Sequence, residues 1–150
     1  MEARIKNPAV ILGASNSIQD IYKAVMAGGL EPVIAELVHL RTSQINGCAP
    51  CVYSGAGNMR RMQESDERIA LVTAWRDAPF YTDEEKAALG LAEAATRMAD
   101  GAEGVTDAVW DRAAQFFDEK QLAAIVMMVA LTNMFNRLNG TTRQVAGQGW

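Results

Sequence analysis

Cys48 and Cys51 are separated by two residues and follow Asn46-Gly47, a pair that commonly ends a helix. This position predicts that a new helix begins at or near Cys48, where unpaired backbone amides and the helix dipole favour a thiolate over a thiol. Cys51 would lie on the same face, close enough to Cys48 for an intramolecular disulfide. Such a dithiol can attack a peroxide or a disulfide with one sulfur and close onto the other.

Two other interpretations of this pair stay open: half of a zinc site, or two small buried residues. A structural zinc site takes four Cys or His ligands, and His39 is the one further Cys or His in the sequence. Redox chemistry is therefore favoured over metal binding. We expect neither a metal nor an organic cofactor.

The segment before the cysteines is predicted to be a helix that starts at Pro32 and ends at Asn46-Gly47. Glu36 and His39 fall on a polar strip of this helix, about one turn apart. Arg41 points into the apolar arc, so its charge needs a partner. We expect that partner to be an ion pair within the chain or a contact between subunits.

The run from Glu36 to Cys51, ELVHLRTSQINGCAPC, resembles the AhpD-like (alkyl hydroperoxidase D-like), CxxC-bearing branch of the carboxymuconolactone decarboxylase superfamily. The stretches AWRDAPFY at 74–81 and TNMFNRL at 132–138 also resemble this family, so the likeness spans about residues 30–140. It implies one all-α domain over residues 1–150 with six to seven helices, a thiol-dependent peroxidase activity, and homo-oligomers that are trimers or hexamers. The decarboxylases of the superfamily lack the dithiol.

In that family a glutamate, two cysteines and a histidine form a proton relay that activates the second cysteine, while the first cysteine resolves the product. Glu36, Cys48 and Cys51 match three of these groups, and Gly55 stands where the family has the histidine. Because glycine cannot transfer a proton, the resemblance implies weak hydroperoxidase activity that Gly55→His would raise. Alternatively, Gly55 makes room for a larger substrate and His39 transfers the proton, so that Gly55→His would block activity. A surface or subunit-contact role for His39 also stays open.

Residues with high helix propensity dominate the chain, and alternating strand patterns are almost absent. Capping residues, glycines and prolines predict seven helical segments, at about 8–27 (weak at 13–17, where a break is possible), 32–46, 48–62, 66–78, 82–98, 106–116 and 118–139. Asn133, Asn136 and Arg137 lie near the end of the last segment. They could satisfy buried carbonyls or Glu36, and we expect a structural role.

The net charge of −4, with no basic, aromatic-rich cluster, argues against nucleic acid and anionic membranes as partners. The apolar run near the N-terminus is interrupted by Ser15, Asn16 and Ser17, which does not fit a signal peptide. The most apolar segment, Leu122 to Leu131, is shorter than the roughly 20 residues that span a bilayer, and we expect a buried core helix there. These features predict a cytoplasmic protein.

The sequence therefore predicts a thiol-dependent peroxidase or oxidoreductase in which Cys51 and Cys48 form the redox pair and Glu36 and His39 are candidate proton-transfer groups. Its partners would be a hydroperoxide or disulfide substrate and an external thiol reductant. Two other functions stay open. One is a non-catalytic or redox-sensing homo-oligomeric binding protein. The other is a superfamily enzyme that acts on a small lactone-type organic substrate, with the dithiol incidental.

Overall fold

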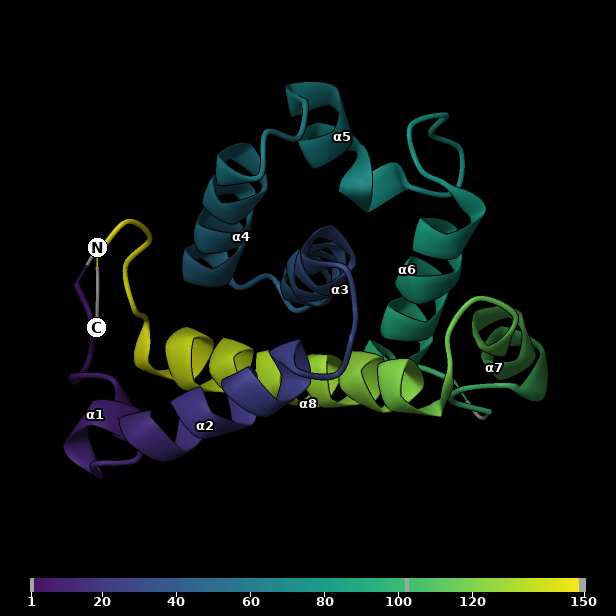
Figure 1. Cartoon of the computed structure of the whole chain (residues 1–150). Coiled ribbons are helices and arrows are strands. Elements are labelled where there is room, and N and C mark those ends of the chain that lie inside the picture. The colour runs from purple at the N-terminus through teal and green to yellow at the C-terminus, as the bar shows by residue number, and fades with distance from the viewer. Residues whose placement is uncertain (1, 102, 149–150) are drawn as a thin grey trace.

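The computed structural model describes residues 2–101 and 103–148, and these residues form helices joined by short turns (Figure 1). In chain order the elements are α1 (Pro8–Ile11), α2 (Ser15–Met26), α3 (Pro32–Ile45), α4 (Ala49–Arg61), α5 (Asp66–Leu71), the 3-10 turn η1 (Val72–Ala74), α6 (Asp83–Thr96), α7 (Asp107–Ala114) and α8 (Glu119–Thr142). The all-α fold class is thus confirmed. The eight α-helices of the described residues slightly exceed the expected six to seven.

The two predicted capping boxes are present, at the starts of α6 and α8. Thr82 accepts a hydrogen bond from the Glu85 amide at the start of α6, and the Glu85 carboxylate accepts one from the Thr82 amide. Asp118 and Gln121 make the same reciprocal pair at the start of α8. Each pair satisfies backbone amides that have no partner inside the helix, which fixes where the helix begins.

The first segment is two helices, as its weak stretch allowed, because Gly13 adopts a left-handed backbone with φ of +66° between α1 and α2. Two other helix boundaries differ from the sequence-based expectation. The fourth segment tightens into η1 after Leu71 instead of continuing to residue 78. The last helix runs through Gly140 and ends only before Arg143, whose own left-handed conformation (φ 57°) supplies the C-terminal turn.

Helix α3 is central to the fold and packs against α4, α6 and α8 (Figure 1). One side of α3 joins an apolar cluster with α6 and α8 through Ile34, Ala35 and Val38. The other side, through Leu37 and Leu40, joins a second cluster with α4, α5 and η1. A helix enclosed on both sides must also bury its polar residues, and those side chains need hydrogen-bond partners.

The buried charge of Arg41 is paired within the chain. This was one of the two partners expected, the other being a contact between subunits. Its Nε and Nη2 atoms donate to Glu93 Oε2 on α6 at 2.9 and 2.7 Å. Glu93 also accepts from Trp75 Nε1 at 3.2 Å and from Arg76 Nη1 at 2.9 Å. Burial alone would raise the pKa of Glu93, but the hydrogen bonds from Arg41, Arg76 and Trp75 outweigh it and hold the pKa at about 2.

Helix α8 is long and apolar enough to pass a length-and-composition test for a membrane span, alone among the described helices. It has 24 residues, more than the run from Leu122 to Leu131 on which the expectation rested. Core helices of globular proteins meet the same test. Here Leu122, Ile125 and Met128 are buried in the cluster with α3 and α6, and α2 covers a further part of α8. This packing supports the interpretation of α8 as a core helix.

Candidate active site

The structure contains the predicted disulfide between Cys48 and Cys51, with the two Cα atoms 5.4 Å apart. Cys48 is the extended N-cap residue of α4, and its amide donates to the Ser43 carbonyl at 3.0 Å. Pro50 lies in the first turn of α4, where its missing amide costs nothing. The turn after α3 and the start of α4 thereby hold both sulfurs at a helix N-terminus.

A cavity of about 640 Å³ reaches one of the two cysteines. Cys51 lines it, whereas Cys48 is not among the described residues that do so. The other lining residues include Tyr22, Arg60, Arg61 and Asn139. Both cysteines are almost fully buried, at 3% and 4% exposure, so this cavity is the access route for a molecule that reacts at Cys51.

Glu36 and His39 form a close pair on α3. Glu36 Oε1 lies 2.6 Å from His39 Nδ1, and Glu36 Oε2 accepts from Asn58 Nδ2 on α4 at 3.0 Å. Glu36 is 5% exposed, so both of its oxygens have partners away from bulk water. The carboxylate can therefore fix the imidazole orientation, as a proton-transfer pair requires.

Gly55 explains why His39 can take this position. A Cβ atom at residue 55 would lie 3.3 Å from Glu36 Oε1, 3.4 Å from His39 Nδ1 and 3.2 Å from Leu40 Cδ1. A larger side chain would therefore press on the carboxylate, the imidazole and the leucine together. The His39 ring lies against the position at which the AhpD-like pattern has its histidine.

The negative charge of Glu36 also acts on Tyr22, which lines the cavity. Burial raises the pKa of the Tyr22 hydroxyl, and the negative charge of Glu36 raises it further. Tyr22 lines the cavity, although Glu36 and His39 do not belong to its described lining. The Glu36–His39 pair thus stands behind the cavity wall, on the helix that packs against α4.

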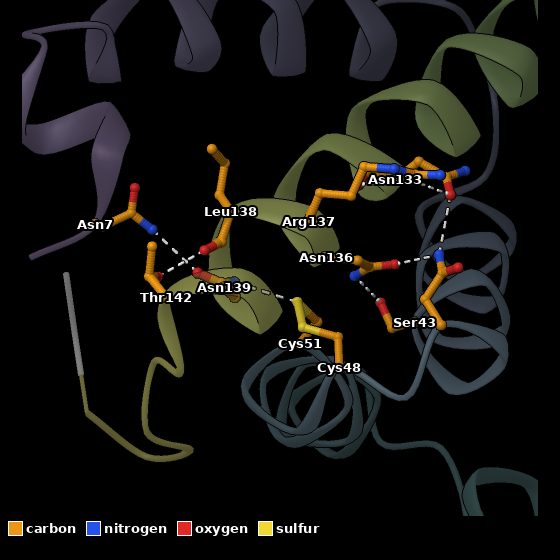
Figure 2. Close-up of a disulfide and its surroundings, with 11 residues drawn as sticks. Asn7, Ser43, Cys48, Cys51, Asn133, Asn136, Arg137, Leu138, Asn139 and Thr142 are labelled. Atoms are coloured by element: carbon orange, nitrogen blue, oxygen red, sulfur yellow. Dashed lines mark hydrogen bonds between the residues drawn. A yellow bond between two sulfur atoms is a disulfide. The ribbon is translucent and has the colours of Figure 1, made fainter. Parts of the chain in front are cut away.

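Two asparagines of α8 serve the structural role that was expected. Asn136 Nδ2 donates to Ser43 Oγ at 3.2 Å, and its Oδ1 accepts from Asn46 Nδ2 at 2.8 Å (Figure 2). Asn133 Oδ1 accepts from the same Asn46 group at 3.0 Å and from Arg137. These residues brace the turn before Cys48, and the hydrogen bonds of Glu36 go to His39 and Asn58 instead.

Sequence reasoning missed Asn58 and Asn139. Asn139 Nδ2 donates to Cys51 Sγ at 3.3 Å, although Asn139 was interpreted only as part of a helix end (Figure 2). A polar residue within a long apolar helix was the available signal, because a buried amide must have a partner. Asn58 gave no comparable signal, since its contact with Glu36 depends on how α3 and α4 pack.

Comparisons with known proteins agree with this fold. Residues 14–94 match the carboxymuconolactone decarboxylase family. The uncharacterized protein YdfG of Bacillus subtilis is 33% identical over 122 residues, which cover 81% of this chain and 82% of YdfG. A crystal structure of an Agrobacterium tumefaciens protein of unknown function, provisionally described as the antioxidant defence protein AhpD, superimposes with a TM-score of 0.90. It is 28% identical, and the match covers 99% of this chain and 100% of that one.

A more distant structure shares the fold alone. This is an uncharacterized peroxidase-related protein from Silicibacter, 20% identical, with a TM-score of 0.75 over 87% of this chain and 68% of that one. The family match covers more than half of the chain, and YdfG is similar over most of its length. The chain therefore belongs to the carboxymuconolactone decarboxylase family, in its AhpD-like branch.

Proposed function

We propose that this protein is a thiol-dependent oxidoreductase that reduces organic hydroperoxides or disulfides with its Cys48–Cys51 pair. The observation that carries this proposal is the unequal access of the two sulfurs. Cys51 opens onto the cavity of about 640 Å³ and Cys48 does not. Cys51 is thus the sulfur that meets the substrate, and Cys48 is the sulfur that resolves the product.

The reaction begins with the reduced dithiol. The Cys51 thiolate attacks the terminal peroxide oxygen, so that the O–O bond breaks, Cys51 becomes a sulfenic acid and the alkoxide takes up a proton and leaves as an alcohol. The Cys48 thiolate then attacks the Cys51 sulfur, which forms the disulfide and releases water. An external thiol reductant supplies two electrons and two protons to restore the dithiol. With a disulfide substrate, the same two steps pass through a mixed disulfide.

The Glu36–His39 pair is the proposed proton-transfer group. Its 2.6 Å contact and its place beside Gly55 support the imidazole as the substitute for the absent relay histidine. The pair would take up the Cys51 proton and return it to the leaving oxygen, with water or the side chains that line the cavity as the relay. Because the cycle needs an external thiol reductant, a reducing compartment such as the cytoplasm suits it.

Steady-state hydroperoxide consumption in the presence of a dithiol reductant tests this function. We expect turnover by the wild type and a loss of at least about 100-fold for Cys51→Ser, because the attacking thiolate is gone. Exchange of the thiols without peroxide turnover would favour a redox-sensing protein. Turnover of a lactone-type substrate with both cysteines replaced by serine would make the dithiol incidental and contradict the proposal.

A further inference from the structure

A chain of buried side-chain amides ends on the sulfur of Cys51 (Figure 2). Asn139 Nδ2 donates to Cys51 Sγ at 3.3 Å, and Asn139 Oδ1 accepts from Asn7 Nδ2 at 3.0 Å. Asn7 Oδ1 in turn accepts from the Ala9 amide at 2.9 Å, as the N-cap of α1. Asn7 and Asn139 are only 2% and 4% exposed. The Glu36–His39 pair takes no part in this chain.

The direction of each hydrogen bond in the chain follows from the one before it. The Ala9 amide can only donate, so Asn7 must present its carbonyl oxygen to it. The NH₂ group of Asn7 then faces Asn139, which must present its own oxygen in return. The NH₂ group of Asn139 is thereby directed at the sulfur. A lone asparagine could turn its oxygen to the sulfur instead, but this one is fixed by Asn7.

The N-terminal segment is held in place by hydrogen bonds with the end of α8 and the turn that follows it. The Arg4 amide donates to the Thr142 carbonyl at 2.9 Å, and Gln144 Nε2 donates to the Ile5 carbonyl at 2.9 Å. Asn7 is therefore positioned against α8 by contacts that do not involve the cysteines. Its place in the amide chain is built into the fold.

We propose that Asn139 is a positioning residue that stabilises the Cys51 thiolate, and that Asn7 sets the amide orientation on which this depends. Burial disfavours a charged sulfur, and a directed N–H donor offsets that cost because a hydrogen bond to the charged form stabilises it. The proposal deepens the proposed function, since it concerns the acidity of the attacking thiol. It assigns the N-terminal segment, far from Cys51 in sequence, a part in that acidity.

Other groups near Cys51 also contribute to its electrostatic environment. Around the cavity these are Tyr22 on α2 and Tyr53, Arg60 and Arg61 on α4, and α8 adds no charged side chain to the described lining. Glu36 and His39 on α3 lie at Gly55, one turn beyond Cys51. None of these groups changes in the variants below, so a shift in thiol acidity reports on the amide chain.

The test measures the pH dependence of Cys51 alkylation by iodoacetamide in reduced protein that carries Cys48→Ala, so that one thiol remains. In Asn139→Leu we expect the midpoint to rise by about one pH unit, which lowers the rate by about tenfold at any pH well below both midpoints. Asn7→Ser keeps an oxygen that can cap α1, adds no charge and removes the NH₂ group. The amide of Asn139 is then no longer fixed and can turn its oxygen to the sulfur, which should raise the midpoint as well.

Asn136→Leu is the matched control, because Asn136 is a similarly buried asparagine of α8 whose partners are Ser43 and Asn46. It should leave the midpoint within about 0.3 pH unit, about a third of the shift expected for Asn139→Leu. An unchanged midpoint in Asn139→Leu, or an equal shift in Asn136→Leu, would overturn the proposal. If Asn139→Leu fails to fold, the Asn7→Ser midpoint decides alone, and an unchanged or lower value overturns the proposal. Alkylation needs no peroxide, so this result stands apart from the failure or success of the peroxidase assay.

Discussion

The side chains of Glu36 and His39 lie against the Cβ position of Gly55 on α4, the helix that begins at the two cysteines. The imidazole approaches Glu36 beside a residue 55 that has no side chain, and a hypothetical Cβ there would lie 3.2 to 3.4 Å from three neighbouring atoms, which would have to shift by a few tenths of an ångström. This geometry supports the proposal that His39, and not an added histidine at residue 55, is the proton-transfer group. It also makes the two variants at residues 39 and 55 informative together.

We expect His39→Ala to lower hydroperoxide turnover by about 10²-fold, the low end of what a general base contributes. Gly55→His should also lower turnover, because the new ring would displace His39 and Leu40. Gly55→Ala, which adds only a Cβ, should have a smaller effect in the same direction. Initial rates at pH 7 measure all three. A gain in Gly55→His, with His39→Ala unchanged, would instead support a missing relay that a histidine restores.

At this scale the sequence predicts residue types better than it predicts contacts. The spacing of Cys48 and Cys51 predicts their disulfide, because both lie within one helical turn. Arg41 in an apolar arc predicts a partner, but Glu93 is 52 residues away and could not be chosen from the sequence. The amide contact of Asn139 with Cys51 depends on how α8 crosses α4, which no local pattern encodes.

Among the helices, the close crossing of α2 over α8 depends on a glycine. A Cβ atom at Gly28, just after α2, would lie 2.4 Å from the Ala124 Cβ atom of α8 and 2.8 Å from the Val25 carbonyl oxygen. Gly28→Ala should therefore destabilise the protein by about 1–3 kcal/mol, as overpacking of a core does. Gly140 is the matched control, because it lies within α8 with nothing within 4 Å of its Cβ position.

Gly140→Ala should stabilise the protein by up to about 1 kcal/mol, since alanine is the better helix former. Urea denaturation of both variants gives the two free energies of unfolding. Equal effects at the two sites would contradict the close approach of α2 and α8.

Gly140 also shows why the end of α8 was misplaced from the sequence. Asn139-Gly140 is a typical terminal pair, but the hydrogen bonds of Asn139 and the left-handed Arg143 let α8 continue.

Helices α3 and α6 are also joined by a titratable ion pair. Glu93 has a pKa of about 2 in the folded protein, below the 4.5 of a free glutamate. A lowered folded-state pKa contributes stability above pH 4.5, and this contribution is lost as the pH falls toward 2. It amounts to about 3 kcal/mol as an upper bound. Glu93→Gln should lower stability at pH 7 and flatten the pH dependence below 4.5, which denaturation at several pH values would detect.

For the molecule as a whole, the exposed apolar residues of the N-terminal helices favour self-association. Leu12 is 80% exposed, Ile11 55% and Val10 44%, at the end of α1. We propose that a second copy of this chain covers them, in keeping with the expected trimer or hexamer. Light scattering after gel filtration should give a multiple of the 16.3 kDa chain mass, and Ile11→Lys with Leu12→Lys should reduce it. A monomer at micromolar concentration would contradict this proposal.

In the proposed cycle Cys51 meets the substrate and Cys48 resolves the oxidised Cys51, and single-turnover trapping distinguishes these two roles. Fully reduced protein is mixed with one equivalent of an organic hydroperoxide, quenched with a sulfenic acid reagent and an alkylating agent, and analysed by mass spectrometry. We predict an intramolecular disulfide in the wild type, a trapped sulfenic acid on Cys51 in Cys48→Ser, and an unreacted Cys48 in Cys51→Ser. A sulfenic acid on Cys48 in Cys51→Ser, formed as fast as the wild-type disulfide, would contradict the account.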